Sequence, residues 1–335
     1  MPPLVSVVIV SWNSARYLER CLSALSLQVF RDFEVIMIDN GSTDGSVETV
    51  EEKWKSLGIQ VKKLGVNRGF AAANNIGAQL ACGEWLALLN SDAFPEPGWL
   101  ENLVRAAQEH PEYTFFASRQ VQANHATALD GAGDAYHVSG LAWRRFYGFP
   151  IDRFGLDKEE VFGPCGAAGF YARKAFFDAG GFDEDFFSYH EDVDLAVRLR
   201  LRGSRCLYIP EASVFHVGSA SLGHVSDFAV YHVHRNIIWS YLQNMPFSIL
   251  LQYIFVHVIA NIIYAVYYTL KGKGKAFFRA KWDALLGIPK ALAKRKKIQE
   301  RRVAREADLL NAMEQGWLQP YTLGHKLRAV LKKGV

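Results

Sequence analysis

The sequence predicts an α/β protein built on an open, mostly parallel, doubly wound sheet. Three apolar runs are typical of buried strands, and each ends in polar residues: VSVVIVSWN (5–13), FEVIMIDNGSTDGS (33–46) and WLALLNSDA (85–93). Helical patterns separate these runs, and such alternation favours a parallel sheet. Because 50% of the 335 residues are hydrophobic, the chain can bury a core for one large domain with appendages, or for two domains.

The first ninety residues alternate between the two kinds of element. A stripe typical of an amphipathic helix follows the strand at 5–10, formed by Leu18, Cys21, Leu22 and Leu25. The next elements expected are a strand at 33–38, an exposed helix at 45–58, a strand at 59–64, an Ala-rich helix at 71–83 and a strand beginning at 85.

The polar strand ends predict a ligand site. Ser11 to Asn13, Asp39 to Asp44 and Asn90 to Asp92 would share one edge of the sheet, where open α/β sheets bind ligands. Asp92, with an oxygen ligand two residues earlier, suits a divalent metal that also binds phosphate oxygens; a turn capped by Asp92 is the alternative. The turn SWNSAR replaces G-x-G-x-x-G, and no G-x-x-x-x-G-K-[ST] occurs, which disfavours nicotinamide, flavin and P-loop chemistry.

The cysteines and the first residues bear on the compartment. Cys21, Cys82, Cys165 and Cys206 are widely spaced, which indicates neither a disulfide framework nor a zinc site and favours a reducing, cytosolic setting. A strand begins within a few residues of Met1, so we expect no signal peptide.

A second motif lies in the later half, GGFDEDFFSYHEDVDLAVRLRLRG (180–203). It joins a Gly-Gly turn and an acidic, aromatic segment to an expected helix that begins near His190, Glu191 and Asp192. Carboxylates are favoured at helix N-termini for capping and dipole reasons, so a purely structural role stays open on the residues alone.

Four segments together resemble a family 2 glycosyltransferase of the GT-A fold. They are VSVVIVSWNS (5–14), VIMIDNGSTDGS (35–46), NRGFAAANNIGAQLACGEWLALLNSDA (67–93) and the 180–203 motif, within a match from about Val5 to about Asn244. The resemblance implies an inverting enzyme that uses a nucleotide-diphospho-sugar and Mg²⁺ or Mn²⁺.

The resemblance also implies roles for residues. The nucleotide-sugar side would comprise Ser11, Asn13, Asp39, Asn67, Gly69, Asn74, Asn90 and Ser91. Asn90 stands where the family's D-x-D motif has its first acid, which leaves Asp92 as the principal acidic metal ligand. Asp192 matches the catalytic aspartate, Glu191 and Asp194 match its flanking acids, and His216 is a candidate to reach the metal or diphosphate.

The form LLNSDA is similar to that of bacterial rhamnosyltransferases and favours dTDP-L-rhamnose as donor, with a UDP-sugar as the alternative. The acceptor expected is a lipid-linked glycan or polysaccharide of the cell envelope. A catalytically inactive GT-A-fold binding protein, recruited to membrane by its tail, is the alternative from another class. The segment 130–150, rich in Gly, aromatics and Arg, is expected to be a mobile loop on the acceptor side.

The expected domains are a catalytic domain at 1–245, with a nucleotide-binding half at 1–110 and an acceptor half at 111–245, and a tail at 246–335. Residues 271–305 hold 13 Lys and Arg against Asp283 and Glu300, a net +11, while the rest holds 25 basic against 32 acidic residues, a net −7. This asymmetry predicts an anionic partner surface. A nucleic acid is disfavoured, since no nucleic-acid motif accompanies the acidic body.

Residues 247–270 contain no Asp, Glu, Lys or Arg and could span a bilayer as a helix. A polar and aromatic stripe recurs along it at Tyr253, His257, Asn261, Tyr264 and Tyr268. Spanning would place the following basic residues opposite a cytosolic catalytic domain, against the positive-inside tendency. We therefore expect a helix in the cytoplasmic leaflet of the inner or plasma membrane, peripheral or monotopic, with the basic residues on anionic headgroups. A helix buried against the catalytic domain is the alternative.

Overall fold

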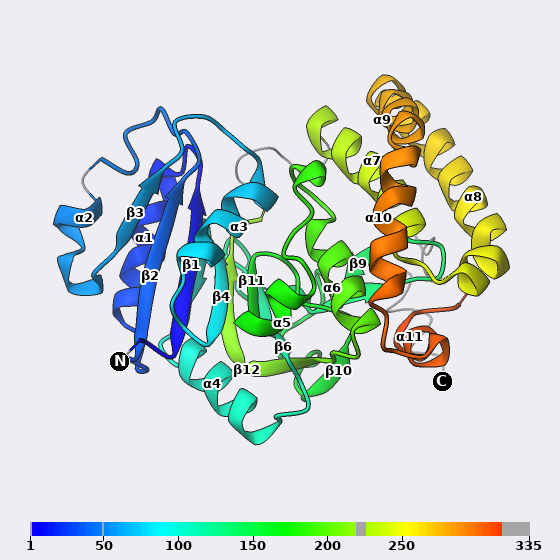
Figure 1. Ribbon diagram of the computed structural model, residues 1–335. Coiled ribbons are helices and arrows are strands. Elements are labelled where there is room, and N and C mark those ends of the chain that lie inside the picture. The colour runs from blue at the N-terminus through cyan, green and yellow to red at the C-terminus, as the bar shows by residue number, and fades with distance from the viewer. Residues whose placement is uncertain (1, 49, 219–225, 317–335) are drawn as a thin grey trace.

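The computed structural model describes residues 2–48, 50–218 and 226–316. One large sheet with helices on both faces fills the left and centre of Figure 1, and a layer of helices lies on the right. Within the described ranges the sheet has ten strands, eight of which follow the order β10-β12-β6-β11-β4-β1-β2-β3. The predicted α/β class is confirmed.

The N-terminal half is parallel, as predicted. Its strands are β1 (Val5–Ser11), β2 (Phe33–Asp39), β3 (Gln60–Lys63) and β4 (Trp85–Asn90). The helices between them are α1 (Ala15–Ser26), α2 (Val50–Lys53), the 3-10 turn η1 (Lys55–Leu57) and α3 (Phe70–Leu80). The register sets Ser11 opposite Asp39 and Val10 opposite Asn90, so the polar strand ends do meet at one edge.

Alternate side chains of these strands enter two cores. Val8 packs in one core with the alanines of α3, whereas Val7 and Ile9 pack in the other with Leu18 and Leu22 of α1. This is the two-sided burial that a parallel sheet requires.

The second half makes the sheet mixed, because β11 lies antiparallel between β4 and β6. Its strands are β5 (Ala93–Pro95), β6 (Phe115–Gln122), β7 (Leu129–Ala132), β10 (Glu159–Val161), β11 (Ala168–Ala172) and β12 (Cys206–His216), with β8 (Asp134–Tyr136) and β9 (Ala142–Arg144) as a separate pair. Its helices are α4 (Trp99–Glu109), α5 (Arg173–Asp178), η2 (Glu184–Phe186) and α6 (Glu191–Leu201).

The segment 130–150, expected to be a mobile loop, is instead largely strand and turn. Strands β7 to β9 lie within or next to it, and Asp130, Asp134, Tyr136 and His137 are buried. The spacing of its short strands is too irregular to show a period in the sequence. Strand β7 pairs with β6, which lies earlier in the chain, and β8 and β9 pair with each other.

The helical layer consists of α7 (Asp227–Asn244), α8 (Phe247–Leu270), α9 (Gly274–Leu286), α10 (Ile288–Glu300) and the short α11 (Glu306–Ala312). Helix α7 packs on α6, α9 and α10, so it joins the layer to the sheet domain (Figure 1). The proposed division at residue 245 falls between α7 and α8. Residues 317–335 of the expected tail lie outside the described residues.

Helix α8 coincides with the predicted apolar segment and is long and apolar enough to cross a membrane. The buried residues along it are Ile249, His257 and Ala260. Its polar and aromatic stripe faces the protein: His257 Nδ1 lies 2.7 Å from the Ser139 carbonyl oxygen, and Asn261 Oδ1 accepts a 2.5 Å hydrogen bond from Lys281 Nζ. The rings of Tyr264 and His234 are 5.1 Å apart. The stripe therefore docks α8 on its neighbours and leaves the other side exposed.

Candidate functional site

The edge formed by the carboxyl ends of β1, β2 and β4 gathers the predicted donor-side residues. Asn13, with φ 50°, turns its Oδ1 to the Thr43 backbone N–H at 2.9 Å. Asp39 Oδ1 accepts from the Ser42 N–H at 2.9 Å, and the Ser14 and Ser91 hydroxyls lie 2.8 Å apart. These bonds tie the three strand ends together.

Asn67 and Gly69 belong to a loop that Asn40 holds. Asn40 Nδ2 donates to Asn67 Oδ1 at 3.0 Å, and Asn67 Oδ1 also accepts from the Gly69 N–H at 2.8 Å. Asn40 Oδ1 accepts from the Arg68 N–H at 2.8 Å. A side chain at Gly69, where φ is +85°, would place Cβ 2.5 Å from the Phe187 carbonyl oxygen, so only Gly fits here.

Several predicted residues are less open to a ligand. Ser11, Asp39 and Asn74 are buried, and Asn74 Nδ2 donates to the Phe70 carbonyl within α3 at 3.0 Å. Asn90 is half-buried, and its N–H is used by the Ala167 carbonyl oxygen at 2.9 Å. Asn75, for which the sequence predicted no role, bonds Phe182 and Glu184 and so joins α3 to the segment before α6.

Asp92 and His216 lie side by side because β5 and β12 pair, with Ala93 opposite His216. His216 Nε2 is 3.5 Å from Asp92 Oδ1, while Nδ1 is 2.8 Å from Asp130 Oδ2. Asp130 in turn contacts Arg144. The result is a buried line of alternating charge, Asp92–His216–Asp130–Arg144.

The two neighbouring carboxylates determine the protonation of His216 and the orientation of its ring. Burial alone would lower its pKa, but the hydrogen bonds and charges of Asp130 and Asp92 raise that pKa to about 9. Nδ1 is committed to Asp130, so Nε2 is the atom turned to Asp92. A carboxylate that orients a histidine in this way is the usual outer partner of a metal-binding imidazole. A cation at Nε2 would take the place of the proton that the raised pKa keeps there, so this donor set fits a divalent cation.

Asp192 is the second residue of α6 and is half-buried. Its Oδ2 accepts from the Gly166 N–H at 2.9 Å and its Oδ1 from the Val193 N–H at 2.8 Å. Burial raises the pKa of this carboxyl above its ordinary value, while the two N–H bonds and the charge of Arg144 oppose that rise. An accessible carboxylate with a raised pKa suits proton acceptance.

Two groups beside Asp192 had no predicted role. Ligand atoms of Asp134, Cys165 and Asp192 all lie within 4.8 Å of one another. Burial, followed by the charge of Asp192, raises the pKa of Asp134 well above its ordinary value. Arg144 is ion-paired with Asp130 and lies opposite Asp134 in the β8–β9 pair, and its positive charge opposes the rise in the pKa of Asp134 and of Asp192.

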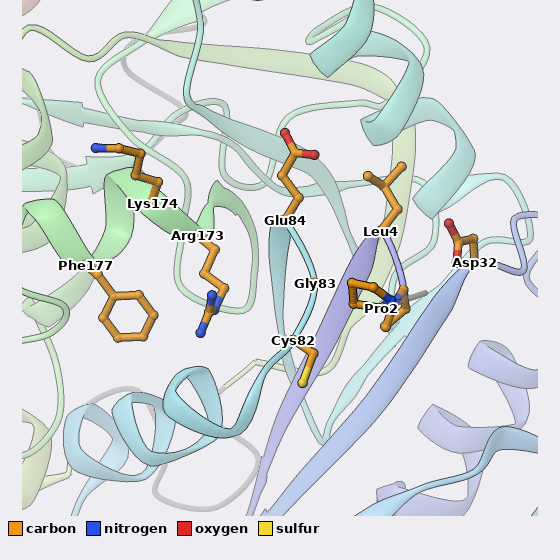
Figure 2. A pocket seen from close by; sticks show the side chains of 10 residues that line it. Pro2, Leu4, Asp32, Cys82, Gly83, Glu84, Arg173, Lys174 and Phe177 are labelled. Atoms are coloured by element: carbon orange, nitrogen blue, oxygen red, sulfur yellow. The ribbon is translucent and has the colours of Figure 1, made fainter.

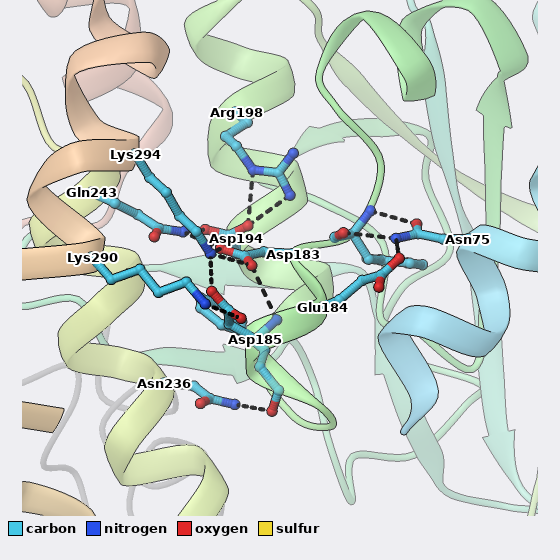
Figure 3. A network of polar contacts seen from close by, with 12 residues as sticks. Asn75, Asp183, Glu184, Asp185, Asp194, Arg198, Asn236, Gln243, Lys290 and Lys294 are labelled. Carbon is cyan, nitrogen blue, oxygen red and sulfur yellow. Dashed lines mark hydrogen bonds and ion pairs between the residues drawn. The ribbon is translucent and has the colours of Figure 1, made fainter. Parts of the chain in front are cut away.

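The acids that flank Asp192 differ sharply in environment. Glu191 is buried, its Oε2 has no hydrogen-bond partner among the described residues, and burial and Asp192 raise its pKa well above the ordinary value. Asp194 is fully buried in an ion pair with Arg198 at 2.6 Å and accepts from Gln243 (Figure 3). It also accepts from Asn244. Asp192 alone of the three is accessible and not ion-paired.

A hollow elsewhere on the molecule is lined by Pro2, Leu4, Asp32, Cys82, Gly83, Glu84, Arg173, Lys174 and Phe177 among others (Figure 2). Leu4, Asp32 and Glu84 immediately precede β1, β2 and β4, so this hollow lies at the amino ends of the strands. Ligands of such sheets bind at the carboxyl ends, and the hollow is therefore separate from the site built by Asp92 and Asp192.

Comparison with known proteins now bears on the family. The model of the family described as "Glycosyl transferase family 2" matches residues 6–177, half of the chain. The chain belongs to glycosyl transferase family 2. It is 31% identical over 238 residues to the N-acetylglucosaminyl-diphospho-decaprenol L-rhamnosyltransferase of Mycobacterium tuberculosis, covering 64% of this chain and 76% of that one.

Solved structures confirm the family 2 fold. S. aureus TarS 1-349 in complex with UDP-GlcNAc superposes with a TM-score of 0.59 at 19% identity, covering 100% of this chain and 92% of that chain. GalNAc-T7 with UDP, GalNAc and Mn²⁺ gives a TM-score of 0.58 at 20% identity, covering 71% of this chain and 47% of that chain. The predicted GT-A fold is thereby confirmed, and the family match confirms the predicted glycosyltransferase class.

Proposed function

We propose that the chain is an inverting glycosyltransferase that moves L-rhamnose from dTDP-L-rhamnose to a lipid-linked glycan during cell-envelope assembly. The observation that supports it most is the placement of Asp192 at the start of α6, an accessible carboxylate whose two oxygens are held by the Gly166 and Val193 N–H groups. The similar mycobacterial protein, named for rhamnose transfer to a decaprenyl-linked N-acetylglucosamine, supports the choice of donor and acceptor.

Asp192 is the proposed base. Inversion requires the acceptor hydroxyl to attack the anomeric carbon from the face opposite the departing nucleotide diphosphate, and Asp192 takes the proton of that hydroxyl. The Gly166 and Val193 N–H bonds fix both of its oxygens. A positioned base of this kind contributes about 10² to 10⁴ in rate. Glu191 is proposed to support it from the buried side.

Asp92 and His216 are the proposed ligands for Mg²⁺ or Mn²⁺. The cation, when bound, stabilises the negative charge that develops on the leaving diphosphate. Asp130 holds the His216 ring so that Nε2 faces Asp92, and Asn90 and Ser91 directly precede Asp92 in the chain. Ser11, Asn13, Asp39, Asn67, Gly69 and Asn74 are proposed to form or support the nucleotide side.

We further propose that the protein acts at the cytoplasmic face of the membrane, peripherally or as a monotopic protein. Two helices that pack together each expose an apolar stripe. We call these stripes the α8–α9 face: Phe247, Leu251, Phe255, Val258, Ile262 and Val266 of α8, with Phe278, Trp282, Leu285 and Leu286 of α9. The exposed Lys271 and Lys275 lie at the turn between the helices, where they can meet anionic headgroups.

The geometry modifies the expectation for the basic tail. Lys281, Lys290 and Lys294 bond the protein itself rather than standing free for headgroups. The polar stripe of α8 contacts other parts of the protein along the length of the helix. A helix that lies in one leaflet therefore fits better than one that crosses the bilayer.

Donor binding tests the function. Thermal melts with Mn²⁺ should show stabilisation by dTDP-L-rhamnose, since a ligand at about 100 times its Kd adds about 2.7 kcal/mol to the free energy of unfolding. UDP-sugars are the matched comparison. Stabilisation by a UDP-sugar and not by dTDP-L-rhamnose would make that UDP-sugar the donor. Donor binding without turnover on a polyprenyl-diphosphate acceptor would favour the inactive binding protein.

A further inference from the structure

The segment Phe186–His190, which connects η2 to the helix that carries Asp192, has an unusual backbone. Phe187, Tyr189 and His190 have φ values of 65°, 67° and 69°, three of the five non-glycine residues with positive φ among the described residues. Positive φ is unfavourable for residues that carry a side chain, so the surrounding structure must impose this conformation.

One side chain on α7 makes three hydrogen bonds to the backbone of this segment. Asn236 is fully buried, and its Nδ2 lies 3.0 Å from the Phe186 carbonyl oxygen, 3.0 Å from that of Ser188 and 2.7 Å from that of Tyr189. An amide nitrogen has two hydrogens, so these three acceptors use its whole donor capacity. Figure 3 shows Asn236 reaching this segment from α7.

Arg235 bonds the same segment and also bonds Asn236. Its Nη2 donates to the carbonyls of Asp185 and Phe186 at 3.0 and 2.9 Å, and its Nε donates to Asn236 Oδ1 at 3.0 Å. The amide of Asn236 is thereby oriented with its nitrogen toward the segment.

The segment touches both sides of the proposed site. The His190 carbonyl accepts the Asp194 N–H at 3.0 Å, the first hydrogen bond of the helix turn that contains Asp192. On the other side, the Phe187 carbonyl accepts the Ala71 N–H at 3.2 Å and occupies the space that a side chain on Gly69 would need. A shift in this backbone would therefore move the base relative to the nucleotide side.

We propose that Asn236 is a positioning residue: by holding the left-handed backbone at 186–190, it sets the place of Asp192 relative to the donor. This inference rests on the proposed role of Asp192. A misplacement of about 1 Å is enough to cost about 10²-fold in rate.

The test compares Asn236→Asp with a matched control. The change is nearly isosteric and keeps the oxygen that Arg235 bonds, but it removes both donors. Gln28→Glu removes the donors of another fully buried amide, which bonds the Ala24 and Glu96 carbonyls away from the site. Asn236→Ser, which retains one donor, serves as a second variant.

We expect Asn236→Asp to lower kcat by about 10- to 100-fold with a donor KM close to that of wild type, and Asn236→Ser to lower it less. Amide hydrogen exchange should speed up at 186–192 in the Asn236 variants and stay at the wild-type rate there in Gln28→Glu. An unchanged kcat, with or without faster exchange, overturns the proposal, as does failure of both Asn236 variants to fold. Exchange is measured without donor, so an inactive wild type would instead count against the proposed function.

Discussion

Asp192 is the residue whose change should affect the proposed reaction most directly. Asp192→Asn keeps the shape of the side chain but cannot accept a proton, so kcat should fall by about 10² to 10⁴ while donor affinity changes little. Steady-state kinetics paired with donor-induced thermal shifts measure both quantities. The exposed Asp152→Asn is the control, and an Asp192→Asn enzyme within a few-fold of wild type would remove Asp192 as the base.

Asp130 should act through His216. Asp130→Asn removes the carboxylate that holds His216 Nδ1, and loss of such an outer partner typically weakens metal binding by about 10- to 100-fold. A Mn²⁺ titration of donor binding would reveal the change, with the exposed Asp157→Asn as control. Equal Mn²⁺ requirements in the two variants would show that the cation binds elsewhere.

Glu191 offers a prediction on stability. Its folded-state pKa is raised well above the ordinary value, mainly by burial, so the native state favours the protonated acid. The unfolded chain releases this proton as pH rises through about 4.3, and the native state loses relative stability from there up to the raised pKa. Glu191→Gln avoids that loss, so its gain in Tm over wild type should grow from acid to neutral pH. A constant difference across a pH series of melts would contradict this.

At the scale of elements, α8 and α9 should form the membrane contact. Leu251→Ser, Phe255→Ser and Trp282→Ser together should weaken binding to anionic liposomes, since burying each such side chain is worth about 1.5 to 3 kcal/mol. Leu27→Ser, Val29→Ser and Val66→Ser remove side chains of similar exposure, 58–62% against 63–75%, from the other end of the chain.

Co-sedimentation across a salt series separates the two forces at this face. Contacts of Lys271 and Lys275 with headgroups should weaken with salt, because charges are screened within about 10 Å at 0.1 M. The apolar contribution should persist. If the α8–α9 variant still binds as well as the control variant, the membrane contact lies elsewhere.

Elements also show what local pattern can predict. The buried strands follow from continuous apolar runs, and the polar stripe of α8 follows from a helical period in the sequence. The residues that the stripe contacts cannot be predicted in this way. They include Ser139 and Lys281, and the contact between Ser139 and His257 joins residues 118 apart in the chain.

The whole molecule explains which site residues were missed. Strand ends converge because parallel register alone brings Ser11, Asp39 and Asn90 to one edge, so these could be predicted. Asp130 and His216 are 86 residues apart, and Asn236 lies 47 to 50 residues from the carbonyls it holds. Such pairs depend on how β7, β12 and α7 pack, which no local pattern specifies.

Helices α7 and α10 connect the α8–α9 face to residues 183–190, which precede Asp192. Lys294 bonds both Asp183 and Asp185, Lys290 bonds Asp185, and Asn236 holds the residues that follow (Figure 3). Helix α10 thus supports the acceptor half directly, although it lies beyond the proposed domain boundary at residue 245.

The anomeric configuration of the product is the decisive measurement. NMR of the glycan formed by the wild-type enzyme from dTDP-L-rhamnose, Mn²⁺ and a polyprenyl-diphosphate-linked N-acetylglucosamine should show a rhamnosyl bond inverted relative to the donor. Asp192→Asn should form that product far more slowly. A product with retained configuration would contradict direct displacement with Asp192 as the base, whatever the donor.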